Sequence, residues 1–185
     1  MKPEIILIGP IGSGKTTVAE LLSMKTGLPR RSMDELRWKY FDEIGYDRDL
    51  ARHHFVREGC WGIYRYWKRF EAYAVKRLLS EHDNCVIDLG AGNTVYEDDR
   101  LFNEVQETLT SYPYVVLLLP SPNPQESIEI LNARTQYMPD GQDSINEHLI
   151  HHPSNHTLAK FTVYTRDKTP EETCDEILRW VRGQE

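Results

Sequence analysis

The sequence is poor in cysteine, in long apolar runs and in positive charge. Its 185 residues include only three cysteines, Cys60, Cys85 and Cys174, which are widely spaced and form no C-x-x-C pair. This scarcity argues against a disulfide framework and a zinc site, and it predicts buried free thiols in a reducing cytoplasm. No apolar run approaches the ~18 residues that a membrane-spanning helix needs, and the strand-like start of the chain is unlike a signal peptide.

Acidic residues outnumber basic ones, 29 to 22, which gives a net charge of −7 at pH 7. Such a chain has no general attraction for nucleic acid or for an anionic membrane, so neither is expected as a partner. A phosphate-bearing ligand would have to be held by a local site. The length fits one domain and the 39% of apolar residues can build a core, so residues 1–185 are expected to form a single domain.

Short apolar runs alternate with longer amphipathic stretches. The runs predict buried strands at residues 5–8, 85–89, 114–119 and 161–164, with a weaker signal at 28–32. The stretches predict helices at residues 15–25, 34–44, 54–80, 98–111, 124–137 and 170–181. The helix at 54–80 is either one long helix or two joined by a kink. This alternation predicts a three-layer α/β/α fold around a parallel sheet of about five strands.

Residues 138–155 break this alternation. The segment is polar, rich in histidine and interrupted by proline and glycine. An irregular stretch of ~18 residues inside a compact domain is often a lid or a binding loop, so a lid is expected here. His148, His151 and His152 would share one face if the segment were helical and could then bind a metal. A polar lid is the favoured interpretation, because no second pair of ligands stands at a recognisable spacing.

The most specific motif follows the first predicted strand at once. Residues 9–16 read Gly-Pro-Ile-Gly-Ser-Gly-Lys-Thr, which is G-x-x-x-x-G-K-S/T between a strand and a helix. The glycines let backbone N–H groups turn towards phosphate oxygens, and the helix adds the positive end of its dipole. Lys15 would reach the β- and γ-phosphates, and the Thr16 hydroxyl would ligate Mg²⁺. The motif predicts an ATP–magnesium site formed by Gly9, Gly12, Ser13, Gly14, Lys15, Thr16 and Thr17.

Five short segments after this P-loop stand in a characteristic order. They are Ser32-Met33-Asp34, Lys68-Arg69-Phe70-Glu71, Gly90-Ala91-Gly92, Leu131-Asn132-Ala133-Arg134-Thr135 and Asp167-Lys168-Thr169-Pro170-Glu171-Glu172. Together with the P-loop they resemble the shikimate kinase family, whose motifs at these places are D-x-D, R-x-x-E, G-G-G, L-x-x-R-T and D-G-K-x-P-E-E. The resemblance spans nearly the whole chain. It implies transfer of a phosphoryl group from ATP to a hydroxyl of a small acceptor.

The resemblance also implies which residues meet the acceptor. The family holds the ring and carboxylate of shikimate with the second Asp of D-x-D, the Arg of R-x-x-E and the triple glycine. These places are occupied here by Asp34, Lys68, Gly90, Ala91 and Gly92. A lysine does not reproduce the planar fork of an arginine, and the family's lid arginine has no counterpart in residues 138–155. The nucleotide site is therefore expected to be retained and the acceptor pocket to be altered.

Four charged residues each have more than one possible role. Asp34 takes the proton of the acceptor hydroxyl, holds a magnesium-bound water, or caps a helix. Asp88 ends a predicted strand, where it either holds magnesium through water or only closes a tight turn. Arg65 shares a basic helix face with Lys68 and either binds the acceptor or faces solvent. Arg134 either contacts adenine and the transferring phosphoryl group, or lies on the surface.

A small-molecule kinase with an altered acceptor pocket is the favoured function. Its partners would be ATP, with Mg²⁺, and a small hydroxylated acceptor. Two alternatives use the same P-loop: a nucleotide-dependent regulatory module and a plain NTPase. The N/T-K-x-D motif that small GTPases use for guanine is absent, which favours ATP over GTP. Both a monomer and a homodimer fit the sequence.

Overall fold

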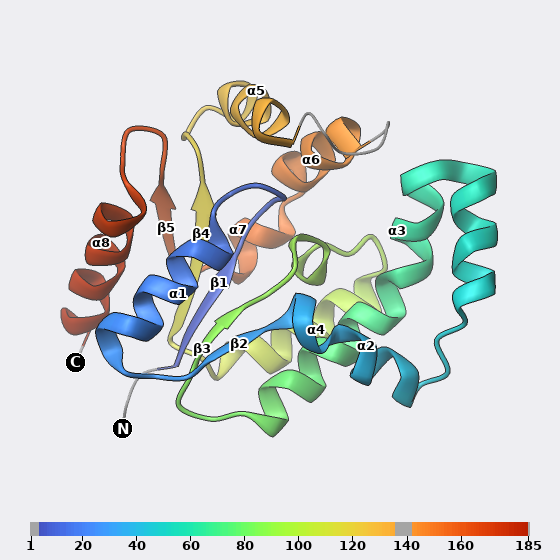
Figure 1. Ribbon diagram of the computed structural model, residues 1–185, viewed down its shortest axis with the longest axis horizontal. Helices are drawn as coiled ribbons and strands as arrows, with labels where there is room; N and C mark the ends of the chain where they lie inside the picture. Colours follow the sequence, from blue (N-terminus) through green and yellow to red (C-terminus); the bar gives the residue numbers. More distant parts are fainter. Residues whose placement is uncertain (1–3, 136–141, 185) are drawn as a thin grey trace.

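The core of the fold is a parallel β-sheet. The computed structural model describes residues 4–135 and 142–184. The strands are β1 (Ile5–Ile8), β2 (Arg30–Ser32), β3 (Val86–Asp88), β4 (Tyr114–Leu119) and β5 (Phe161–Tyr164). They lie in the order β2-β3-β1-β4-β5, and each neighbouring pair is parallel (Figure 1). The predicted sheet of about five strands is confirmed, including the weakly signalled strand near residues 28–32.

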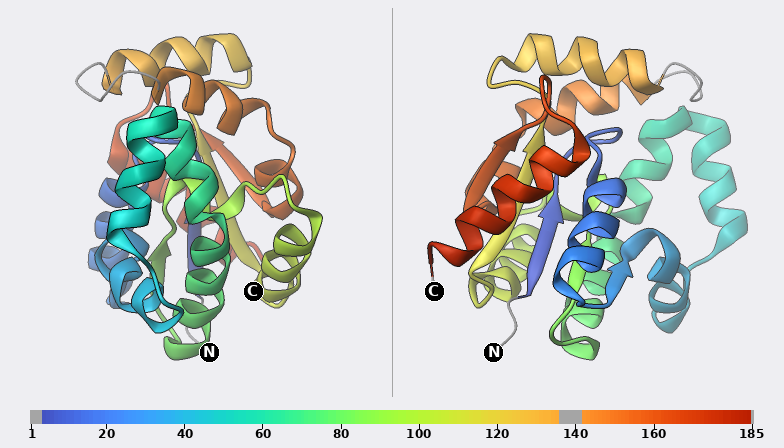
Figure 2. Two further views of the ribbon diagram at one scale, coloured as in Figure 1. Left: turned by 90° about the vertical axis from the view of Figure 1, so that its right-hand side faces the viewer. Right: turned by 60° about the vertical axis from the view of Figure 1, so that its left-hand side comes forward.

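Helices cover both faces of this sheet. They are α1 (Lys15–Thr26), α2 (Met33–Glu43), α3 (Arg48–Glu81), α4 (Asp99–Thr110), α5 (Pro124–Thr135), α6 (Gln142–His151), α7 (Ser154–Leu158) and α8 (Pro170–Arg182), with a 3₁₀ helix, η1, at Ala91–Thr94. Val116 and Leu118 of β4 pack in a core with residues of α1 and α8, whereas Val115 and Leu117 pack in a core with residues of α3 and α4. The helices α1 and α8 lie on one face of the sheet, and α3 and α4 lie on the other (Figures 1 and 2). The alternation of side chains along β4 thus builds two cores, and the predicted three-layer fold is confirmed.

The long helix α3 is broken at Gly59, where φ is 60° and ψ is −147°. The chain turns back there, so that residues 48–58, which we call the α3 arm, lie beside the segment that follows (Figure 1). A Cβ atom on Gly62 would lie only 2.3 Å from the carbonyl oxygen of His54, so the two segments pack backbone to backbone. The kinked alternative for residues 54–80 is therefore the one that the structure shows, and the helix begins earlier than predicted.

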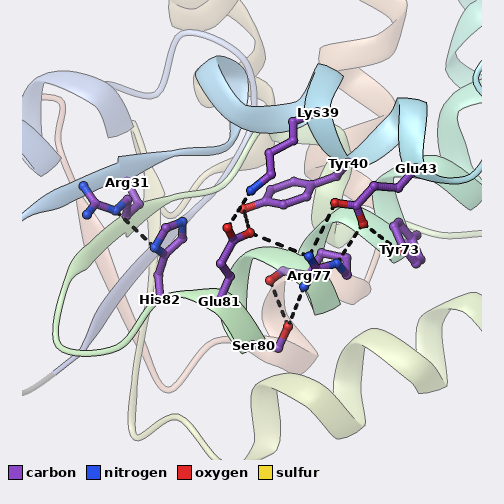
Figure 3. Close-up of polar contacts among 9 residues, drawn as sticks. All are labelled: Arg31, Lys39, Tyr40, Glu43, Tyr73, Arg77, Ser80, Glu81 and His82. Carbon is purple, nitrogen blue, oxygen red and sulfur yellow. Dashed lines mark hydrogen bonds and ion pairs between the residues drawn. The ribbon is translucent and has the colours of Figure 1, made fainter.

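Polar contacts fix α2 against the end of α3 (Figure 3). Glu81 accepts hydrogen bonds from Lys39 at 2.5 Å and from the Tyr40 hydroxyl at 3.0 Å. Arg77 donates to Glu43 at 2.8 Å. These contacts hold the body of α2 in place, and they thereby set the position of its first turn at the edge of the sheet.

The expected irregularity of residues 138–155 is wrong for most of the segment, whereas its expected role as a lid stays a prediction. Residues 142–151 form α6 and residues 154–158 form α7, while residues 138–141 lie outside the described residues. The apolar side chains of Ile145 and Leu149, one helical turn apart, are 7% and 1% exposed. Ile150, also 7% exposed, is the third apolar residue of α6, and burial of these side chains stabilises a helix whose other positions are polar.

The cysteines fit the prediction made from their scarcity. Cys85 and Cys174 are buried free thiols, and Cys60 is buried as well. Within residues 4–135 and 142–184, no helix has both the length and the apolar character that crossing a membrane requires.

Candidate nucleotide and acceptor site

The loop between β1 and α1 is tightly curled, and three of its positions have backbone conformations that favour glycine. Gly9, Gly12 and Gly14 have φ values of 139°, 78° and 92°. A Cβ atom on Gly9 would lie 2.5 Å from the carbonyl oxygen of Leu118. Gly14 is the N-cap residue of α1 and provides no side-chain cap, so the first N–H groups of the helix remain available to an anion.

Lys15 lies inside this curl. Its Nζ atom donates hydrogen bonds to the carbonyl oxygens of Gly9 at 2.8 Å and Pro10 at 2.9 Å. Burial lowers the pKa of Lys15 to about 8, although the negative charge of the Asp88 carboxylate acts to raise it. The ammonium group is thus held in a partly desolvated position where it would meet the phosphates of a bound nucleotide.

Two buried oxygens beside Lys15 have no hydrogen-bond partner among the described residues. They are Oδ1 of Asp88 and Oγ of Ser13. Asp88 is 3% exposed at the end of β3, and burial raises its pKa, although hydrogen bonds from Ser32 and Thr16 oppose the rise. An orphaned carboxylate oxygen next to a threonine hydroxyl fits a hydrated Mg²⁺ ion, which typically uses one or two protein ligands together with water and phosphate.

These residues open onto a cavity of about 600 Å³. Residues 12–17 line one end, and Asp34, Asp88 and residues 90–92 line the part beside the sheet. The remaining wall is mainly apolar and includes Phe55, Ile63, Trp67, Ile145 and Leu149. The structure therefore brings the predicted phosphate-binding residues and most of the predicted acceptor residues to one cavity.

Lys68 and Arg65 lie outside the lining of this cavity. Lys68 is 7% exposed, and its Nζ atom donates to the carbonyl oxygens of Gly92 at 2.8 Å and Val95 at 3.1 Å. It also forms an ion pair with Glu71 at 2.6 Å. Since an ammonium group has three donors, those of Lys68 are used within the protein. Arg65 forms an ion pair with Glu58 of the α3 arm, and both Arg65 and Lys68 line a neighbouring cavity instead.

Arg37 is a cavity-lining cation that the sequence analysis missed. It lies one helical turn after Asp34 on α2, forms an ion pair with it and has a side chain that is 17% exposed. Its guanidinium lies 5.5 Å from the ring centre of Trp67, and burial lowers its pKa. A Cβ atom on Gly90 would lie 3.1 Å from Asp34 Oδ1 and 3.2 Å from Arg37 Nη2. The i,i+3 spacing of Asp34 and Arg37 is the signal that could have found it.

Two more residues reach the P-loop from α5 and α6. Arg134 Nη1 donates to the carbonyl oxygen of Gly12 at 3.1 Å. Asn146, which is fully buried, accepts a hydrogen bond from the backbone N–H of Ile11 at 3.1 Å. The role predicted for Arg134 stays a prediction, and the contact of Asn146 with the P-loop had no sequence signal.

The histidines of α6 and the segment after it do not assemble a metal site in the described part of the chain. His148 Nε2 lies 2.6 Å from Glu97 Oε1, which also accepts a hydrogen bond from Tyr64 at 2.9 Å. Although burial acts against it, these hydrogen bonds lower the pKa of Glu97. No cluster of three or more His, Cys, Asp or Glu side chains is placed to hold a metal within the ranges 4–135 and 142–184.

The fold and the loop geometry define a class, the P-loop nucleotide-binding proteins. A family model for shikimate kinase matches residues 11–182. Since this match covers nearly the whole chain, the protein belongs to the shikimate kinase family, and the resemblance seen in the short motifs is confirmed.

Individual relatives are distant. A shikimate kinase from Flavobacterium psychrophilum is 22% identical over 94% of this chain and 96% of that protein. One from Marinomonas sp. is 32% identical over 53% of this chain and 49% of that protein. The chain thus spans about half the length of most curated relatives that it matches. The solved structure of a shikimate kinase from Acinetobacter baumannii in complex with shikimate has a TM-score of 0.71, with 21% identity over 99% of this chain and 94% of that one.

Proposed function

We propose that the protein is a kinase that transfers the γ-phosphoryl group of ATP to a hydroxyl group of a small acceptor. The observation that carries this proposal is one cavity that is lined by P-loop residues 12–17 and also by Asp34 and residues 90–92. A phosphate donor and a hydroxyl acceptor bound there would lie next to each other. Proximity and orientation are the main contributions that a protein makes to phosphoryl transfer.

The P-loop side binds and orients the donor. The open N–H groups at the start of α1 and the Lys15 ammonium would hold the β- and γ-phosphates. Thr16 and Asp88 would hold Mg²⁺, which when bound neutralises the charge that develops on the phosphate oxygens. Arg134, which already reaches Gly12, would add positive charge beside the transferring group.

The acceptor side binds the hydroxyl and moves its proton. Asp34 Oδ1 lies beside Gly90 and is oriented by its ion pair with Arg37. A carboxylate in this position would accept the proton of the acceptor hydroxyl as that oxygen bonds to phosphorus. The absence of a side chain on Gly90 leaves room for the acceptor between the Asp34 carboxylate and the backbone.

The helix α6 covers the cavity and would exclude water, the competing nucleophile. Ile145 and Leu149 of α6 line the cavity, and Asn146 ties the helix to the P-loop through Ile11. A closed apolar cover of this kind favours transfer to the acceptor over hydrolysis.

The proposal is tested by ADP formation with ATP and Mg²⁺, with and without a panel of small hydroxylated compounds. Stimulation by a panel member that disappears in Lys15→Ala supports it. An NTPase or a nucleotide-dependent regulatory module is the second candidate, because Lys68, which stands at the place of the family's acceptor-binding arginine, is used inside the protein. ATP binding without stimulation by any compound would favour that candidate. The free thiols also support a proposed cytoplasmic location.

A further inference from the structure

We infer that the acceptor is an uncharged hydroxylated compound with a sizeable apolar body, and not a carboxylic acid. The inference rests on the proposed function, because it concerns the acceptor of the same cavity. Two independent features carry it: the balance of charges on the acceptor side and the apolar character of the opposite wall.

The charges on the acceptor side are already paired. Asp34 forms an ion pair with Arg37, and Glu71 forms one with Lys68. Beyond the P-loop, Arg37 is the only cation among the described residues that line the cavity. A carboxylate in the acceptor would have to displace Asp34 from Arg37 and leave that aspartate unpaired. Although the Asp34 side chain is 60% exposed, its freed carboxylate would then lie close to the like charge of the acceptor, and like charges at short range repel each other, so this arrangement selects against acids.

The opposite wall provides a surface for an apolar group. Phe55 comes from the α3 arm, Ile63 and Trp67 from the following segment of α3, and Ile145 and Leu149 from α6. Phe55 is 43% exposed. A bound ligand that covers this side chain would remove apolar surface from water, which favours binding. Apolar side chains from these three segments thus line the space next to the hydroxyl-binding groups.

The wall is rigid as well as apolar. The indole Nε1 of Trp67 donates a hydrogen bond to the Tyr46 hydroxyl at 2.9 Å, and its ring packs edge to face with those of Trp38 and Phe41. A ring held in this way provides contact area without a large loss of side-chain entropy on binding. A cavity of about 600 Å³ is large enough for a ligand with a ring substituent in addition to its hydroxyl group.

The competing interpretation is that Arg37 exchanges Asp34 for the carboxylate of an acidic acceptor. A guanidinium group has five donors in a fork that suits a carboxylate, so it has the chemistry for this exchange. The two interpretations differ in a measurable way: one predicts a preference for neutral compounds with an apolar group, and the other a preference for acids that depends on Arg37.

Matched compounds decide between them. Glucose, phenyl β-glucoside and phenyl β-glucuronide share one sugar scaffold; the second carries an apolar ring on the anomeric oxygen, and the third also has a carboxylate in place of the C6 hydroxymethyl group. Shikimate and its methyl ester form a second pair that differs in charge. Binding is measured by calorimetry with a non-hydrolysable ATP analogue and Mg²⁺ present. We expect the phenyl glucoside to bind at least about tenfold more tightly than glucose or the glucuronide, and the ester more tightly than the acid.

Two variants make the test specific to the cavity. Phe55→Ser should weaken binding of the phenyl glucoside several-fold, whereas Val56→Ser, at the adjacent and 76% exposed position outside the cavity lining, should not. Preference for the acids over the matched neutral compounds, or failure of every phenyl compound and ester to bind, would overturn the inference. If the ATP analogue still binds in the same titrations, the nucleotide site is intact. A negative result would then count against the inference about the acceptor and not against the proposed function.

Discussion

The buried side chain of Asn146 in α6 accepts a hydrogen bond from the backbone N–H of Ile11, 3.1 Å away in the P-loop. The bond joins the helix that covers the cavity to the loop that would hold the phosphates. Because α6 also places Ile145 and Leu149 on the cavity wall, the position of this helix and the shape of the P-loop depend on each other. Closure of the cavity and binding of the nucleotide are therefore expected to be coupled.

Asn146→Ala tests this coupling. Loss of the bond leaves a backbone donor unpaired, so the free energy of unfolding should fall by about 1–2 kcal/mol. Activity should fall several-fold and ATP hydrolysis without acceptor should rise, because water enters more easily. Glu147→Gln, an exposed neighbour on the same helix, is the control and should change neither. Unchanged kinetics in Asn146→Ala would show that the bond serves stability alone.

Lys68 is predicted to act in folding and not in acceptor binding. Lys68→Met removes the partner of the buried Glu71 carboxylate, which is expected to cost about 3–5 kcal/mol of stability. In the double variant Lys68→Met/Glu71→Gln no unpaired charge is left, so part of the lost stability should be recovered. Thermal unfolding of the three proteins checks this. A large rise in KM for the acceptor in Lys68→Met, with stability unchanged, would instead place Lys68 in the acceptor site.

Substitution of Gly92 is predicted to lower the stability of the protein. A Cβ atom there would lie 2.6 Å from Glu71 Oε1 and 3.1 Å from Lys68 Nζ, so Gly92→Ala must displace the buried ion pair. We expect a loss of about 1–3 kcal/mol in unfolding free energy together with weaker acceptor use. Gly183→Ala, where the nearest atoms would be 3.5 Å away, is the matched control and should be nearly neutral. Equal stabilities of the two variants would contradict the close packing of Gly92.

The affinity for ATP is predicted to fall above pH 8. In the unliganded protein burial lowers the pKa of Lys15 to about 8, so at higher pH a growing fraction of the lysine is neutral. Bound phosphates favour the protonated form, and binding must then take up a proton. The affinity should therefore fall by up to about tenfold for each pH unit above 8. Titrations from pH 7 to 9.5 check this. Lys15→Arg stays charged over that range and should show no such slope; a similar slope in both proteins would contradict the assignment to Lys15.

The sequence predicted those features that depend on neighbouring residues. The P-loop was recognisable because its glycines, lysine and threonine stand in one short segment between a strand and a helix. The central strands β1 and β4 were recognisable because all of their residues are buried and none is polar or charged enough to interrupt the apolar run. The kink in α3 could be anticipated but not placed, since it depends on the packing of Gly62 against a segment eight residues earlier.

The features that the sequence did not reveal depend on tertiary contacts. The helix α6 was not predicted because apolar residues such as Ile145 and Leu149 are few in a mostly polar segment. Only their burial shows which face of the helix packs against the protein. Arg37 lies in no recognised motif, yet the packing of α2 brings it to the cavity beside Asp34. The place of Lys68 in a motif suggested acceptor binding, whereas its side chain is directed to the carbonyl oxygens of Gly92 and Val95.

If donor phosphate and acceptor hydroxyl meet in one cavity, the γ-phosphoryl group of ATP must appear on the acceptor. This is measured by following the label of γ-³²P-ATP in the presence of Mg²⁺ and a compound that binds the acceptor side. We expect label on the acceptor, loss of this transfer in Lys15→Ala, and strong reduction in Asp34→Asn with ATP binding retained. Label found only in inorganic phosphate, at a rate that no acceptor changes, would contradict this expectation.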